Sequence, residues 1–186
     1  MMGTDRGTFT RRSFLAASCG IAASCGAPGV KTPGRTGGRV PIAAVITEYC
    51  RNSHADVIVG RMLEGYEYYG EFRTPGVRVV AMYTDQVPAN DLSREMAARH
   101  GVRIAPTIAD AVAPGGKLAV EGVVIVGEHG NYPYNEKGQH LYPRFELFQR
   151  TVECFLAAGK TVPVFCDKHM SYDWSKARRM YDWSKK

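Results

Sequence analysis

Short apolar runs that alternate with helical segments are the feature that most constrains the fold of this chain. The runs place apolar residues at consecutive positions, which predicts strands buried on both faces. They lie at 40–47, 77–83, 101–104, 120–126 and 162–166. Segments of helical periodicity lie at 54–69, 91–100, 107–112 and 143–159, and a last one starts near 171. We therefore predict an α/β fold, a Rossmann-like doubly wound parallel sheet of about five strands.

The first 38 residues differ from this pattern and predict an exported protein. Arg11 and Arg12 precede Ser13-Phe14-Leu15, and a run of small, mildly apolar residues follows at 16–27. A paired arginine before such a run is typical of a twin-arginine signal peptide, which we assign to 1–27. The run is too short for a stable membrane span. Residues 28–38 read as a Gly/Pro-rich linker and 39–186 as one domain, which we expect in the periplasm or outside the cell.

The charge of the predicted domain argues against nucleic acid as a partner. The whole chain has a formal net charge of +6, and the segment before Arg39 holds five basic residues and one acidic residue. That segment therefore carries +4, which leaves +2 for the domain. A nearly balanced domain lacks the basic footprint of a nucleic-acid-binding protein.

Polar residues with catalytic or ligand-binding chemistry follow the predicted strands. The carboxyl ends of parallel strands form the ligand crevice in such folds, so we expect these side chains to line a site for a small molecule. They are Arg51, Asn52 and His54 after the first strand, Asp85 after the second, Glu128, His129 and His140 after the fourth, and Asp167, Lys168 and His169 after the fifth.

Three of these segments carry a family resemblance that runs from about residue 40 to the end of the chain. Asp85 ends the second strand, and an alanine-rich helix with Ala97-Ala98-Arg99-His100-Gly101-Val102 follows. Gly159-Lys160-Thr161-Val162 precedes the fifth strand, which ends in Asp167-Lys168-His169. In this order of features the chain resembles the nucleotide-binding domain of the glucose-fructose oxidoreductase and inositol dehydrogenase family, Gfo/Idh/MocA. It also looks like exported bacterial proteins that share its Glu-His-Gly-Asn-Tyr-Pro stretch at 128–133.

The resemblance implies an oxidoreductase that uses NAD or NADP on a sugar-like or small polar substrate. Lys168 would be the catalytic lysine and Asp85 the ribose-binding acid. Asp167 and His140 complete the candidate catalytic set. The family's substrate domain does not follow Lys168 in this sequence. Either the sequence is a piece of a longer chain, or a dehydrogenase of this kind needs a second copy or a partner chain to cover the site.

The remaining candidate cofactor-binding residues are Arg51, Asn52 and Glu128. No Gly-x-Gly-x-x-Gly follows the first strand; Arg51 and Asn52 stand there instead. The Arg51 guanidinium has the charge and fork geometry to bind a phosphate.

Two alternatives do not require a nucleotide. The first is a hydrolase or lyase that uses a divalent metal, with His54, His129 and His169 as ligands beside the acidic residues of the same loops. If the fifth strand continues through His169, then Asp167 and His169 share one face. The spacing contains no His-Glu-x-x-His pattern. The second alternative is a non-catalytic module whose crevice holds a small polar ligand.

Overall fold

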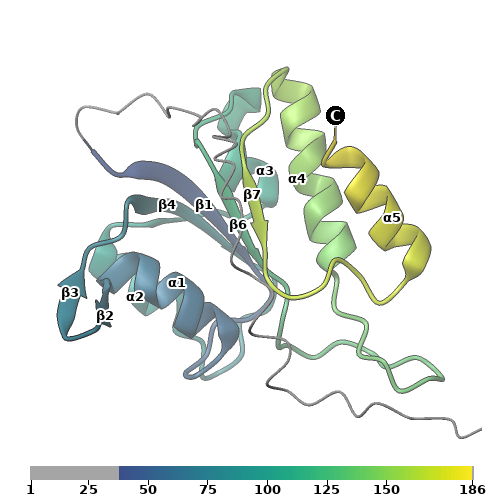
Figure 1. The fold of residues 1–186 in the computed structure, drawn as a ribbon, viewed down its shortest axis with the longest axis horizontal. Coiled ribbons are helices and arrows are strands. Elements are labelled where there is room, and N and C mark those ends of the chain that lie inside the picture. The colour runs from purple at the N-terminus through teal and green to yellow at the C-terminus, as the bar shows by residue number, and fades with distance from the viewer. Residues whose placement is uncertain (1–37, 186) are drawn as a thin grey trace, which may run out of the picture. The chain divides into compact units, whose positions relative to one another are not determined.

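The computed structural model describes residues 38–185, shown as a ribbon in Figure 1. The predicted export signal at 1–27 and the predicted linker up to residue 37 lie outside the described residues. In the part of the chain that is described, no helix is long and apolar enough to cross a membrane.

The central sheet has five strands, all parallel, in the order β5-β4-β1-β6-β7. The chain leaves the central strand β1 toward β4 and β5, and then returns to the other side for β6 and β7. This doubly wound sheet confirms the predicted Rossmann-like fold. The strands are β1 (Val40–Ile46), β4 (Val77–Thr84), β5 (Arg103–Ile104), β6 (Val123–Val126) and β7 (Val164–Cys166).

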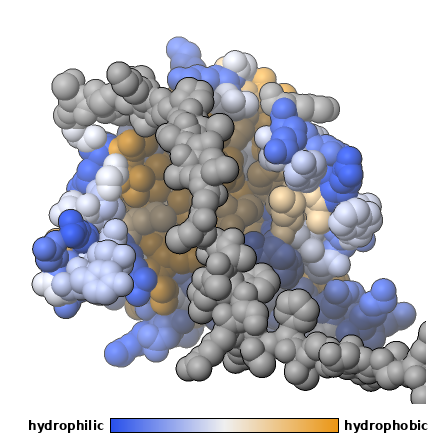
Figure 2. Space-filling view, viewed as in Figure 1, coloured by the Kyte–Doolittle hydropathy of each residue, from blue (hydrophilic) through white to orange (hydrophobic). Residues whose placement is uncertain are grey.

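Helices cover both faces of the sheet (Figure 1). One face carries α1 (His54–Glu64) and α2 (Ser93–His100). The other carries α3 (Ile108–Val112), followed by the short 3-10 turn η2 (Pro114–Gly116), and then α4 (Arg144–Ala158) and α5 (Trp174–Trp183). In Figure 2 the visible apolar surface lies mainly over the strands at the centre, and the flanking helices present mostly hydrophilic residues.

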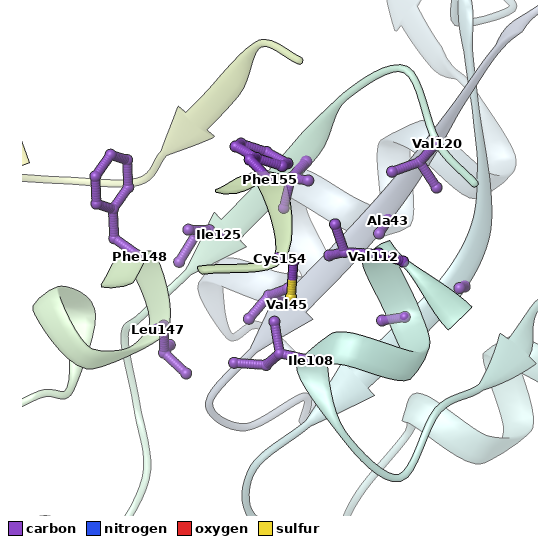
Figure 3. Close-up of a cluster of buried hydrophobic side chains, with 14 of the residues drawn as sticks. Ala43, Val45, Ile108, Val112, Val120, Ile125, Leu147, Phe148, Cys154 and Phe155 are labelled. Atoms are coloured by element: carbon purple, nitrogen blue, oxygen red, sulfur yellow. The ribbon is translucent and has the colours of Figure 1, made fainter. Parts of the chain in front are cut away.

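Alternation along the strands divides the core between these two faces. Ala43 and Val45 of β1 join the cluster beneath α3 and α4, which Figure 3 shows with Phe155 and Ile108. Ile42, Ala44 and Ile46 point to the opposite cluster, beneath α1 and α2. A strand buried on both faces must be apolar at every position, which is why β1 and β6 read as continuous apolar runs.

One predicted helix is wrong at its C-terminal end. Instead of running to Tyr69, α1 ends at Glu64, and an antiparallel hairpin of β2 (Tyr66–Tyr68) and β3 (Glu71–Arg73) follows. Gly65 makes this turn possible because its φ is +89°, and a Cβ there would lie 2.4 Å from Cζ of Phe72 and 2.8 Å from the carbonyl oxygen of Arg73.

The long loop between β6 and α4 crosses the carboxyl edge of the sheet and is seen at the bottom of Figure 1. Asn131 in this loop donates its backbone N–H to Oε1 of Gln86 at 2.8 Å, and Nε2 of Gln86 donates to the Asn131 carbonyl at 3.2 Å. The loop is thereby tied to the segment that follows β4. This brings polar residues from four separate loops toward one end of the sheet.

Candidate active site

The ends of β1 and β6 are joined at the point where the strand order reverses. Thr47, fully buried, donates its hydroxyl to the Glu128 carbonyl at 2.6 Å, and its backbone N–H donates to the Val126 carbonyl at 3.1 Å. Ligands bind at such a switch point in open α/β sheets. Thr47 therefore fixes the backbone of the Glu128–His129 segment beside the expected crevice. Thr47 ends an apolar run, and nothing in the sequence pattern distinguishes it as a site residue.

A histidine–carboxylate pair lies at this edge. His54 is the first residue of α1, and Asp167 directly follows β7. Nδ1 of His54 and Oδ2 of Asp167 are 2.6 Å apart, and Asp167 is only 9% exposed. A carboxylate accepts hydrogen bonds and cannot donate them, so Nδ1 carries the hydrogen. The lone pair of a neutral His54 is then on Nε2, which is the arrangement of an imidazole held by an acid for proton transfer.

A second imidazole lies against the first. The His129 and His54 rings meet edge-on, with centroids 5.3 Å apart, and Nε2 of His129 is buried without a hydrogen-bond partner among the described residues. His129 also has a φ of +66°, Lys168 one of +65° and Asn52 one of +61°. Three non-glycine residues near this pair thus adopt the left-handed conformation, which costs free energy and is concentrated at functional sites.

An unpredicted arginine, Arg144, lies in the interior at the start of α4. It is 2% exposed and forms an ion pair with the Glu128 carboxylate. Gly127 permits the approach, because a Cβ there would lie 2.6 Å from Cγ of Arg144. Burial of a guanidinium without a paired anion is strongly unfavourable, so the ion pair holds Glu128 in place. Glu128, a predicted cofactor ligand, thus forms an ion pair with Arg144 in this structure.

A polar cavity of about 460 Å³ adjoins this ion pair. His140, one of the predicted catalytic residues, lines it as part of an aromatic stack: its ring centroid lies 4.3 Å from that of Tyr134 and 4.0 Å from that of Tyr142. Nε2 of His140 is 2.9 Å from the Tyr132 carbonyl. The cavity is lined by Glu128, Gln139, His140, Tyr142, Arg144, His169, Ser171 and Tyr172. Aromatic rings beside a few convergent polar groups are typical of small-molecule sites.

The residues at the α1 N-terminus do not fit a dinucleotide held in the usual way. Ser53 caps the helix by accepting the Asp56 N–H at 3.2 Å, and the Asp56 carboxylate accepts the Asn52 N–H at 2.8 Å. A pyrophosphate there needs free helix amides and would meet the negative charge of Asp56. The exposed Arg51 forms no hydrogen bond or ion pair within residues 38–185.

The predicted ribose-binding acid is also engaged within the protein. One Asp85 oxygen accepts the Tyr83 hydroxyl at 2.7 Å, and the other accepts the Tyr132 hydroxyl at 2.7 Å. Burial, together with the hydrogen bond to Asp85, raises the pKa of Tyr83 to about 12, and the same two causes raise the pKa of Tyr132. Both hydroxyls therefore stay protonated at neutral pH and keep donating to Asp85.

The predicted catalytic lysine and metal ligands are not brought together. Because β7 ends at Cys166, the expected alternation through His169 does not apply. Lys168 and His169 are exposed, and in the described part of the chain the Lys168 amine forms no hydrogen bond or ion pair. Within residues 38–185, no group of three or more His, Cys, Asp or Glu side chains is arranged to hold a metal ion.

Cys50, in the loop before α1, is not activated. Cys50 donates its thiol to Oε1 of Glu48 at 2.8 Å. Burial, with the Glu48 hydrogen bond as the next cause, raises the pKa of Cys50 to about 11. The nucleophilic form of cysteine is the thiolate, so this thiol is unreactive at neutral pH.

No protein-family model matches this chain, and no significant match was found among curated proteins or among solved structures. The resemblance to the oxidoreductase family therefore stays a prediction. The function has to be argued from the geometry of the site itself.

Proposed function

We propose that this domain is an enzyme that works by general acid–base catalysis on a small polar, sugar-like substrate, with His54 as the proton-transferring residue. The observation that carries the proposal is the 2.6 Å contact between Nδ1 of His54 and the buried Asp167 carboxylate. This contact fixes the tautomer and the ring orientation, and it leaves Nε2 to take a proton from the substrate.

The roles of the two residues differ. Nε2 of His54 accepts a proton from a substrate O–H or from a C–H next to a carbonyl, and the imidazolium that forms is stabilised by the Asp167 carboxylate. The same Nε2 later returns the proton to the leaving group or to the rearranged substrate. Asp167 keeps its charge throughout. Hydrolysis, elimination and isomerisation all need such a group, whereas the α1 N-terminus does not favour nicotinamide chemistry.

The substrate class is supported by the cavity beside the Glu128–Arg144 pair. This pair offers an acceptor and a donor while it adds no net charge, and the rings of Tyr142 and His140 give an aromatic wall. Small hydroxylated molecules combine apolar C–H faces with hydroxyl groups and match such a lining. Glu128 of the cavity lining directly precedes His129, whose ring contacts His54, and His169 of the lining lies two residues after Asp167. The cavity and the histidine–carboxylate pair therefore share the same two loops.

The first test measures the pair directly by nitrogen-15 NMR of the histidine rings. We expect the neutral His54 ring to be the Nδ1–H tautomer in the wild type, and we expect Asp167→Ala to lose this preference. His100, at the end of α2, supplies an internal reference in the same spectra. A wild-type His54 ring that is predominantly the Nε2–H tautomer would refute the proposal, whatever substrate is used.

The second test measures turnover in deuterated water with a panel of small keto sugars, hydroxy acids and sugar esters. We expect proton exchange or product formation that falls by about 10²–10⁴-fold in Asp167→Asn and in His54→Gln. His100→Gln is the matched control and should keep wild-type turnover. Equal turnover in the wild type and His54→Gln contradicts the proposal.

The cavity separately favours a second candidate, the binding of a small polar ligand without turnover. In that case saturation-transfer NMR with the same panel detects binding that His140→Ala removes and His54→Gln leaves unchanged. An enzyme would show both binding and a His54-dependent reaction, so the two functions are distinguishable.

A further inference from the structure

The β2–β3 hairpin displays aromatic side chains that the fold does not bury. Tyr66 is 40% exposed, Tyr68 55%, Tyr69 90% and Phe72 70%. The Tyr68 and Tyr69 rings meet edge-on at 4.5 Å. All six strand residues of this hairpin are exposed. Aromatic rings stabilise a fold mainly by leaving water, so these rings contribute little to the stability of the domain.

The tip of the hairpin holds its aromatic ring at a conformational cost. Tyr69 and Gly70 form a two-residue turn, with φ angles of +50° and +77°. Positive φ at both positions is what a type I′ turn needs, and Asn-Gly provides it with little strain. A tyrosine at the first position is strained, because its Cβ crowds the backbone in the left-handed region. The fold alone would favour asparagine at this position.

The hairpin is also open to another chain. It forms a separate two-stranded sheet, so within the described residues each of its strands has a neighbour on one side only. Figure 1 shows it projecting beyond α1, away from the central sheet. Unpaired strand edges are ready to pair with a further strand, and a hairpin of two strands gains stability when more strands join it.

We propose that this hairpin is the contact surface between two copies of the chain. Two-fold symmetry places the same surface on both copies, so the hairpin must be compatible with itself. It meets that condition, because the Glu71–Arg73 ion pair lies on the same hairpin face as Tyr66 and Tyr68 and leaves that part of the face without net charge.

The exposed area is sufficient for a weak dimer. Phe72 pairs with Glu67 on the opposite face of the hairpin, so only Tyr66, Tyr68 and Tyr69 are counted. With about 200 Å² for each ring, their exposed fractions of 40, 55 and 90% correspond to about 370 Å² of aromatic surface on one copy. Two copies together bring about 740 Å², which is in the range of weak, transient interfaces. We therefore expect a dissociation constant on the order of 10–100 µM.

Sedimentation equilibrium of the full chain, at concentrations on both sides of that range, tests the proposal. The expected result is a monomer–dimer equilibrium in the wild type and a dissociation constant at least about tenfold higher in Tyr69→Asn. Tyr69→Asn removes the ring but gives the turn its preferred Asn-Gly sequence, so its urea midpoint should not fall. Loss of the dimer therefore cannot be attributed to loss of the fold.

Tyr181→Gln is the matched control, since Tyr181 is a 45% exposed tyrosine on α5, outside the hairpin. It should dimerise as the wild type does. A chain that stays monomeric at every concentration overturns the proposal. A dimer that is equally stable in Tyr69→Asn also overturns it, because the copies would then meet through another surface.

Discussion

Replacement of Gly127 by alanine tests whether the buried ion pair is held as tightly as the structure shows. A Cβ at this position would lie 2.6 Å from Cγ of Arg144, whereas ordinary carbon contacts begin near 3.4 Å. Cγ belongs to the buried stem of the arginine and cannot swing into solvent, so the stem or the α4 backbone must shift. Overpacking of this kind costs about 1–3 kcal/mol.

The assay is urea unfolding followed by circular dichroism. We expect Gly127→Ala to lower the urea midpoint by about 1 M, given an m-value of about 2 kcal/mol per molar. Gly76→Ala is the matched control, because a Cβ at Gly76 meets no atom within 4 Å and its φ is not positive. Its free energy of unfolding should stay within about 0.5 kcal/mol of the wild type.

A double-mutant cycle identifies the cause. The background carries Arg144→Ala, which removes the Cγ of residue 144, and Glu128→Gln, which avoids leaving a carboxylate without its partner. The nearest contacts of the new Cβ at position 127 would then be Cα and Cβ of residue 144, at 3.6 Å. Gly127→Ala should then cost less than about 0.5 kcal/mol, which gives a coupling energy of about 1–3 kcal/mol. An equal cost in both backgrounds would refute the reasoning, because the clash would not involve the arginine side chain.

Four further predictions address the same edge of the sheet. Ser53→Ala removes the N-cap oxygen of α1 and should lower the free energy of unfolding by about 1 kcal/mol in urea titrations. Cys50, with a pKa of about 11, should react with iodoacetamide at pH 7.5 roughly a hundredfold more slowly than a simple thiol, and the rate should rise up to about pH 11. The pKa of Tyr132 is raised above the value of about 10 in the unfolded chain, so its contribution to stability is present below pH 10 and declines as the pH rises further. The urea midpoint of Tyr132→Phe should therefore fall less steeply above pH 10 than that of the wild type. Lys168→Gly should keep the Nδ1–H tautomer of His54, because the position needs a positive φ and the Lys168 amine has no partner among the described residues. Lys168→Val should weaken this tautomer preference, because a β-branched residue disfavours positive φ. If Gly weakens the preference and Val keeps it, the amine has a role.

Much of the central fold could be predicted from the sequence because burial on both faces leaves a clear local signal. The apolar runs at 40–47 and 77–83 became β1 and β4 with small changes at their ends. Gly101, directly after α2, has a φ of +64°, the left-handed conformation in which a glycine commonly ends a helix. These features depend on neighbouring residues only, so a periodicity argument can find them.

The sequence does not predict the hairpin, although its strand signal is local. The helical periodicity of α1 continues into the same residues and favours a longer helix instead. Gly65 and Gly70 bracket an aromatic segment with strand propensity, and a glycine five residues before another is compatible with a hairpin. The apolar positions of α1 continue in register with Tyr66 and Tyr69, which made a longer helix look consistent. The contact of Phe72 and the Arg73 carbonyl with Gly65 is seen only in the folded structure.

The pairing of the site residues could not be predicted, because it depends on contacts far apart in the chain. Asp167 meets His54 across 113 positions, and Glu128 is committed to an arginine that reads as an ordinary polar residue at the start of a helix. No spacing rule distinguishes a buried arginine from an exposed one. The sequence therefore indicated the loops that follow the strands, but it did not indicate that Glu128 contacts Arg144 or that Asp85 accepts hydrogen bonds from Tyr83 and Tyr132.

The end of β7 at Cys166 explains why Asp167 contacts His54, while Lys168 is exposed and its amine has no partner among the described residues. Had β7 continued, Lys168 would project from the sheet between Asp167 and His169, as the sequence suggested. The left-handed conformation at Lys168 instead ends the extended backbone after Asp167, whose own N–H is fixed to the Ile125 carbonyl at 2.9 Å. The Asp167 carboxylate is thereby held toward the start of α1, where it contacts Nδ1 of His54, the residue that we propose transfers the proton.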